Sequence, residues 1–151
     1  MTEKNTSFPN GDPVSPLASP ITRALLEELL GKLTALAQEG RDDCIDLLRL
    51  PLPPGALEAL RAWLGRGEIE ATVRALGTTT ITETAIAGIW WVRQSKADGS
   101  AIGETLEIAL CPALLTTDAS DVAQSTEQLR RRMESLVESD SMKSSESADP
   151  R

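Results

Sequence analysis

The spacing of apolar residues changes at Gly67, and this change constrains the fold more than any other feature of the sequence. Before Gly67, apolar residues recur about every 3.6 positions, as on one face of a helix. Over residues 69–75 they alternate with polar residues, as in a strand with one apolar and one solvated face. Three β-branched or alternating runs follow, at residues 78–86, 88–95 and 101–110. The sequence therefore predicts an α+β fold with a four-stranded sheet.

Short connections between these runs predict an antiparallel meander. Asp98-Gly99 is a turn dipeptide between the last two strands, and Pro112 ends the fourth strand. Helices are expected to flank the sheet. A long helix begins after Ser19, its N-cap, and ends near Glu39. Residues 44–48 add at most a helical turn, and shorter and longer helices are predicted at about 54–64 and 120–138.

The polar ends of the chain predict one domain between two disordered segments. Residues 1–18 are rich in proline and polar residues, and residues 139–151 are rich in serine and acidic residues. Neither composition buries enough apolar surface to offset the loss of chain entropy. We therefore expect a disordered arm at 1–18, an α+β domain at 19–138 and a disordered tail at 139–151.

Composition excludes several classes of function. The net charge of -8 opposes binding to the nucleic-acid backbone. The chain has no histidine, which removes the commonest general base and the imidazole metal ligand. Cys44 and Cys111 lie far apart, so an iron-sulfur cluster would need thiolates from another chain. We therefore expect no enzyme activity, no cofactor and no metal. No apolar run reaches the length of about 18 residues that a membrane span needs, so a cytoplasmic protein without membrane contact is expected.

Two charged clusters are interpreted as solvated surface. The acidic group at residues 42–46, which includes Cys44, is more often a polar turn than a metal site. Arg130, Arg131 and Arg132 spread around a helix and cannot form one anion clamp.

The adjacent residues Trp90 and Trp91 must point to opposite faces of their strand. A three-residue loop at 97–99, with glycine in the left-handed conformation, pairs Trp90 with Leu106. We favour this register because it collects the apolar residues of both strands on one face. A two-residue turn would instead pair Trp90 with Glu107 and bury Trp91.

In the favoured register Trp91 stands outward near Arg93 and Glu107. Aromatic residues and arginine are enriched at the centres of protein interfaces, so these three residues are the candidate partner-binding site. The alternative is that a helix covers this face, Trp91 belongs to the core, and Arg93 and Glu107 form an ordinary cross-strand ion pair.

The paired tryptophans also carry a resemblance to a known family. The stretch from about Leu50 to Leu114 resembles the C-terminal conserved region of the HupH/HyaF family, on the residue runs 64–69, 76–78, 88–93 and 104–108. Members of this family are accessory proteins for maturation of nickel-iron hydrogenases. The family is usually longer, with a second related region ahead of this one. Either a homodimer restores the missing half, or the chain is a specialised short relative.

The resemblance implies a chaperone that binds an immature hydrogenase subunit, the iron-sulfur small subunit being the favoured client, and that meets other maturation factors. A general protein-interaction or adaptor module unrelated to hydrogenases is the alternative. An enzyme that uses Glu83, Glu104 or Glu107 is the weakest hypothesis, because no nucleophile or metal pairs with these carboxylates in the sequence.

The purified protein is expected to bind no stoichiometric nickel, zinc or iron, because it lacks imidazole ligands and clustered thiolates. Elemental analysis of the purified chain checks this. One tightly held ion per chain would contradict it, and Cys44→Ser and Cys111→Ser variants would then show whether a thiolate shared across a dimer holds the ion.

Overall fold

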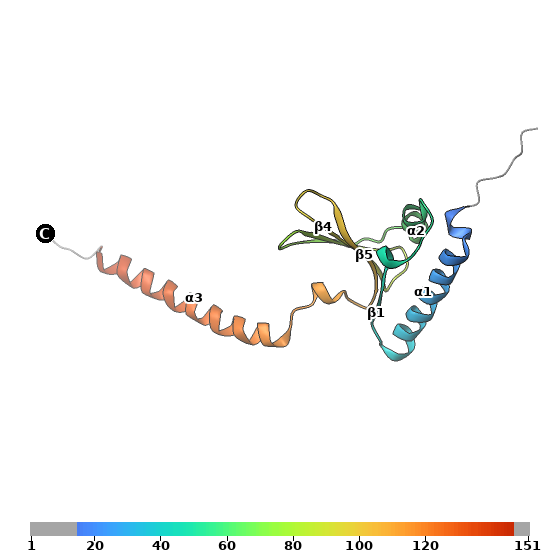
Figure 1. The fold of residues 1–151 in the computed structure, drawn as a ribbon. Coiled ribbons are helices and arrows are strands. Elements are labelled where there is room, and N and C mark those ends of the chain that lie inside the picture. The colour runs from blue at the N-terminus through green and yellow to red at the C-terminus, as the bar shows by residue number, and fades with distance from the viewer. Residues whose placement is uncertain (1–14, 147–151) are drawn as a thin grey trace, which may run out of the picture. The chain divides into compact units, whose positions relative to one another are not determined.

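A computed structural model of the chain describes residues 15–146 (Figure 1). The chain divides into two units, residues 1–112 and 113–151, which are considered separately. Most of the predicted arm lies outside the described residues, and residues 16–18 form a short 3₁₀ helix, Pro16–Ala18. Of the predicted tail, residues 147–151 lie outside the described part, and residues 139–146 belong to the last helix.

The helices of the first unit begin and end near the predicted residues. Helix α1, Pro20–Glu39, is capped by Ser19, whose Oγ accepts a hydrogen bond from the Thr22 amide at 3.2 Å. Gly40 ends it in the left-handed conformation, with a φ of 66°. The other helical elements are the 3₁₀ turn η2, Leu47–Arg49, and helix α2, Ala56–Leu64.

The sheet has five strands, so the prediction of a four-stranded meander is wrong. Its order is β1-β5-β4-β3-β2, and every neighbouring pair is antiparallel. The strands are β1, Asp43–Asp46; β2, Glu70–Arg74; β3, Thr78–Glu83; β4, Ile89–Ser95; and β5, Ala101–Ile108. Only β2 to β5 follow one another as a meander.

The additional strand is β1, which the sequence suggested as a helical turn. It is four residues long, and Ile45 is its one buried residue, so it has no alternating pattern to reveal it. Pairing with the distant strand β5, from Asp43 opposite Ile108 to Asp46 opposite Thr105, holds it extended. Lys32 of α1 also contacts β1, because its Nζ lies 2.8 Å from Asp43 Oδ2. Long-range pairing thus overrides the local preference here.

Helices α1 and α2 pack with one face of the sheet to form the core. Each strand of the central part contributes alternate residues, so Trp91, Leu106 and Ile45 lie side by side across β4, β5 and β1. The core cluster consists of Leu25, Leu29, Leu36, Ile45, Leu47, Leu60, Leu64, Ile89, Trp91, Leu106 and Ile108. The leucines of α1 and α2 in this cluster are therefore buried with β1, β4 and β5, whereas Leu30 of α1 is exposed.

The turn between β4 and β5 is the predicted one, but the register is not. Lys96 donates its amide to Ser100 at 2.9 Å, around a three-residue loop in which Gly99 has a φ of 83°. One strand pair later, Ser95 lies opposite Ala101 and Gln94 opposite Gly103. Ile102 is therefore an extra residue in β5, which shifts the rest of the register by one position.

This bulge makes the prediction of an outward Trp91 wrong. Beyond it Trp90 pairs with Glu107 and Trp91 with Leu106, so Trp91 faces the helices. The two indoles are nearly equally buried, with 5% of Trp90 and 4% of Trp91 exposed. On the opposite face, Trp90 and Val92 are buried together with Ile81 of β3. The turn type alone does not determine which tryptophan joins the main core.

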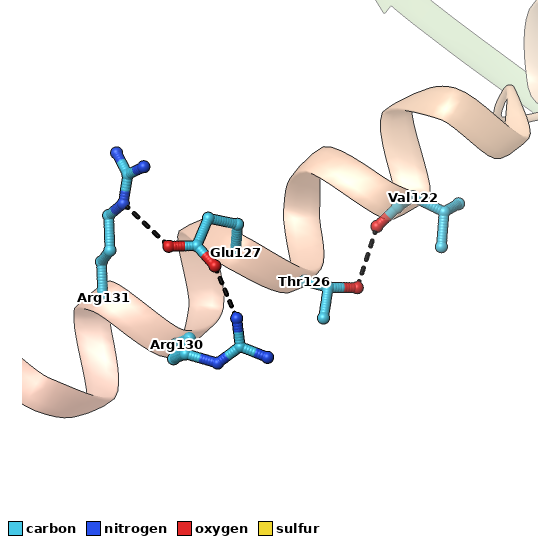
Figure 2. A network of polar contacts seen from close by, with 5 residues as sticks. All are labelled: Val122, Thr126, Glu127, Arg130 and Arg131. Atoms are coloured by element: carbon cyan, nitrogen blue, oxygen red, sulfur yellow. Dashed lines mark hydrogen bonds and ion pairs between the residues drawn. The ribbon is translucent and has the colours of Figure 1, made fainter.

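The second unit contains the 3₁₀ turn η3, Ala113–Leu115, and helix α3, Ala119–Glu146. Two arginines of α3 pair within the helix, because Arg130 and Arg131 both contact Glu127, as Figure 2 shows. Thr126 donates its hydroxyl to the Val122 carbonyl one turn earlier. The predicted apolar stripe of α3 is exposed along its length, at Val122, Leu129, Met133 and Leu136. The interpretation of the arginine run as a solvated face agrees with these contacts.

None of the helices in the described range, residues 15–146, is both long and apolar enough to cross a membrane.

Replacing either paired tryptophan is expected to destabilise the fold. Trp90→Ala and Trp91→Ala each remove a large buried side chain and should lower the free energy of unfolding by about 3 to 5 kcal/mol. Trp63→Ala is the matched control, because the side chain of Trp63 is 56% exposed, and should cost below about 1 kcal/mol. Urea denaturation of the three variants measures this. Wild-type stability of Trp91→Ala would contradict the observed register.

Candidate functional site

A buried glutamate links helix α2 to the helix-facing side of the sheet. Glu104 of β5 is 8% exposed, and its Oε1 accepts a hydrogen bond from Trp91 Nε1 at 2.7 Å. The same oxygen accepts a bond from the guanidinium of Arg61 on α2. Arg61 Cζ also lies 4.7 Å from the centroid of the Trp91 ring, within reach of a cation–π contact. The carboxylate is therefore compensated by one cation and one neutral donor.

The same register places Arg93 beside this network. Arg93 lies directly opposite Glu104 in the β4–β5 pair and opposite Thr80 in the β3–β4 pair. All three residues, like Trp91 two positions earlier in β4, belong to the face that the helices cover. The bulge thus places Glu104 opposite Arg93 in the sheet, while the guanidinium that pairs with Glu104 is that of Arg61.

A cavity of about 420 Å³ opens between α2 and strands β2, β3 and β4. We call it the arginine pocket. Three arginines, two glutamates and three threonines are among its lining residues. The full lining is Arg61, Ala62, Gly65, Arg66, Glu70, Thr80, Thr82, Glu83, Thr84, Trp91 and Arg93.

Two of the three arginines in the pocket have carboxylate partners. Arg61 pairs with Glu104, and Arg66 pairs with Glu70. Arg93 differs, because its Nε is buried and has no hydrogen-bond partner within the described part of the chain. None of the ion pairs among residues 15–146 includes Arg93. Arg93 is thus the cation of the pocket without a counter-ion.

Glu83, the other glutamate in the pocket lining, accepts a hydrogen bond from the backbone. Glu83 Oε2 accepts a hydrogen bond from the Glu68 amide at 3.1 Å. Thr84 is buried, and its hydroxyl lies within hydrogen-bond distance of main-chain carbonyl oxygens in the adjoining turn and at the start of β4. Thr80 and Thr82, by contrast, place their side chains on the pocket face of β3. The pocket therefore offers a guanidinium and hydroxyl groups to whatever enters it.

The structure brings together two of the three predicted partner-binding residues. Trp91 and Arg93 both line the arginine pocket. Glu107 lies opposite Trp90 and Cys44, on the other face of the sheet, and so is not part of this pocket. Whether any of the three binds a partner stays a prediction.

The sequence analysis did not select Arg61 as a site residue, and it considered Glu104 only as a catalytic carboxylate in the weakest hypothesis. One signal was present, because Glu104, Leu106 and Ile108 alternate along one strand and must share a face. A carboxylate at the end of an otherwise apolar row needs a partner when the row is buried. Arg61 follows Leu60 of the buried α2 stripe, but nothing local shows that it reaches Glu104.

The acidic group near Cys44 is held by ordinary surface contacts. The hydrogen bond from Lys32 is the main cause that lowers the pKa of Asp43, and the Cys44 amide adds to it. Asp46 accepts from the Leu48 amide and pairs with Arg49. Within residues 15–146 no three histidine, cysteine or carboxylate side chains are grouped as a metal site, and Cys44 and Cys111 are both free thiols.

Comparison with known proteins assigns this chain to a family. Residues 21–136 match the family model described as the C-terminal conserved region of HupH hydrogenase expression protein. The chain belongs to the HupH family. A solved structure, hydrogenase expression protein HupH from Thiobacillus denitrificans, is similar with a TM-score of 0.70 and 39% identity, over 75% of this chain and 94% of that chain.

Curated relatives carry related names. The hydrogenase expression/formation protein HupQ of Azotobacter chroococcum is 38% identical over 96 residues, which is 64% of this chain and 33% of that protein. HupH of Rhodobacter capsulatus is 29% identical over 113 residues, 75% of this chain and 41% of that protein. The match thus spans about a third to two fifths of the curated relatives' length.

Substitutions at Glu104 should separate the roles of its two partners. Glu104→Gln keeps an acceptor for the Trp91 indole but loses the charge, and should cost about 1 kcal/mol because Arg61 is half exposed. Glu104→Ala leaves the buried indole N–H unpaired and should cost about 2 to 3 kcal/mol.

Glu70→Ala is the control for this comparison. Glu70 pairs with Arg66 at the surface, and its loss should change the free energy of unfolding by about 0.5 kcal/mol or less. Chemical denaturation of the three variants gives the values. Equal destabilisation by Glu104→Gln and Glu104→Ala would show that the charge, and not the indole hydrogen bond, is the dominant contribution.

Proposed function

We propose that this protein is an accessory factor in the maturation of nickel-iron hydrogenase and acts by binding an immature hydrogenase subunit. The observation that carries this proposal is the family match over residues 21–136, which includes both the sheet and part of α3. The names of the relatives from Azotobacter and Rhodobacter, hydrogenase expression/formation proteins, support it.

The arrangement of charged groups supports a binding role without catalysis. Of the carboxylates considered for an enzyme, Glu104 is compensated by Arg61 and Trp91, and Glu83 by the Glu68 amide. Each therefore has a structural partner where a general acid or base would need access to a substrate proton. The histidine-free sequence adds to this, because imidazole is the usual proton-transfer group near neutral pH.

We propose the iron-sulfur small subunit as the client, held while its clusters are inserted or shielded from oxygen. This choice rests on the family resemblance. A role as nickel carrier is less well supported, because nickel prefers imidazole and clustered thiolate ligands that this sequence lacks. Other maturation factors are expected to bind the same client subunit as this protein.

An interaction module unrelated to hydrogenases is the second candidate. The exposed apolar stripe of α3 favours it, since a helix face with Leu129, Met133 and Leu136 exposed is a general docking feature. A homodimer through such a face is one form of this candidate.

A tagged copy of the chain should capture the hydrogenase small subunit from cells that are assembling nickel-iron hydrogenase. More should be captured where cluster delivery to that subunit is blocked, because the immature form then accumulates. Mass spectrometry of the eluted proteins measures this. Cells without the hydrogenase structural genes are the control. Capture of only the finished two-subunit enzyme, or of neither subunit, would contradict the proposal.

A further inference from the structure

The arginine pocket contains a cation whose partner is absent from the described chain. The Nε of Arg93 is buried without a hydrogen-bond acceptor, although Glu104 lies directly opposite it in the register. Glu104 directs Oε1 to Arg61 and Trp91 instead. A buried donor on a charged group is costly to leave unpaired, so such groups are normally satisfied by protein, ligand or water.

Two adjoining cavities have Arg93 in their lining. Arg93 lines the arginine pocket, and it also lines a smaller adjoining cavity of about 340 Å³ with Leu57, Glu58, Arg61 and Glu104. An acceptor entering the larger pocket reaches Arg93 with Thr80 and Thr82 beside it.

We propose that the arginine pocket binds a carboxylate of a partner protein, with Arg93 as its counter-ion. A guanidinium presents a planar fork of donors that matches the two oxygens of a carboxylate. Threonine hydroxyls add single hydrogen bonds at the rim of the site. The inference deepens the proposed function and rests on it only for the identity of the partner.

The charges around Arg93 favour a carboxylate over a phosphate. Glu70 and Glu83 also line the pocket, and the guanidinium of Arg61 is already paired with Glu104. One unpaired cation balances the single negative charge of a carboxylate, whereas it leaves part of the charge of a phosphate dianion uncompensated. Phosphate sites need several donors or cations directed at one point, and this pocket has one that is unpaired.

The size and walls of the pocket favour an acidic side chain over an isolated small anion. A volume of about 420 Å³ exceeds what a carboxylate group alone fills. The ring of Trp91 and the methyl group of Ala62 provide apolar surface next to the polar groups. An aspartate or glutamate on a polypeptide offers the matching combination of an apolar stem and a charged end, and a carboxyl terminus is the other source of the same group.

Peptide titration of the full chain by ¹H–¹⁵N NMR tests the proposal. The probe is acetyl-Gly-Ala-Glu-Ala-Gly-amide, and the same peptide with glutamine is its neutral match. The acidic peptide should cause saturable shifts of the Arg93 Nε–H and Trp91 indole signals, with at least tenfold higher affinity than the neutral peptide. Acetyl-Gly-Ala-Ala with a free carboxyl terminus distinguishes a terminal from a side-chain carboxylate. Tighter binding of inorganic phosphate than of every peptide would overturn the assignment.

Matched variants locate the binding group. Arg93→Gln should weaken binding of the acidic peptide at least tenfold, and Arg132→Gln on α3, with the same change of charge, should leave it unchanged. Arg93→Lys keeps the charge but not the fork, and should bind at least threefold more weakly than wild type. It carries the test if Arg93→Gln does not fold. Wild-type affinity in the folded Arg93 variants, or equal binding of the glutamine peptide, would overturn the proposal.

The peptide titration and the capture experiment test different proposals, so a negative result in one does not decide the other. If the acidic peptide binds but no hydrogenase subunit is captured, carboxylate binding by the arginine pocket is supported and the proposed role in hydrogenase maturation is contradicted. If the small subunit is captured equally well by wild type and by Arg93→Gln while the acidic peptide shows no saturable shifts, the hydrogenase role stands and the pocket proposal is overturned.

Discussion

The position of one extra residue in β5 determines which side of the sheet carries the chemistry of this protein. Ile102 lies between the partners of Ser95 and Gln94, so every pair beyond it is shifted by one residue. Side chains alternate along a strand, and a shift of one position moves each of them to the opposite face relative to its neighbour. Because of this shift, Trp91 lies beside Leu106 in the main core instead of opposite Thr105.

The polar network under α2 follows from this register. Glu104 shares the helix-facing side with Trp91, and burial would be unfavourable for its carboxylate without donors. The indole N–H and the guanidinium of Arg61 supply them. Arg61 is half exposed and reaches Glu104 from α2, so the pairing fixes the helix over the end of the core. Arg93 lies opposite Glu104 in the strand pair, yet none of the ion pairs among residues 15–146 includes Arg93.

Local sequence patterns predicted most of the fold but not its long-range details. The limits of α1 and the alternation of β2 follow from spacing and capping, which act between near neighbours. Strand β1 was missed because its conformation depends on β5, and its single buried residue, Ile45, shows no period. The loop at residues 97–99 was predicted correctly, yet a bulge three residues further on reversed its consequence. No turn rule contains that information.

Only part of the candidate site could be predicted from the sequence, because the rest depends on long-range contacts. Trp91, Arg93 and Glu107 were selected because the favoured register placed them near one another on the outward face, and because aromatic residues and arginine are enriched at interface centres. The partners of Trp91 come from elsewhere in the chain, Arg61 from α2 and Glu104 from β5, and only the folded register brings them within contact. Trp91 was predicted to be an exposed anchor, but it is buried in the core and also lines the arginine pocket.

The charge of the whole chain acts against an acidic partner, and this restricts how the arginine pocket can work. A net charge of -8 repels a carboxylate at long range. The Debye length is about 8 Å at physiological ionic strength, so that repulsion is largely screened between exposed charges, whereas the contact with a partly buried guanidinium is screened much less. The pocket therefore gains little from electrostatic steering and depends on short-range fit. Its recognition comes from the geometry that the bulge and α2 impose on Arg93, which is a property of the fold and not of the overall composition.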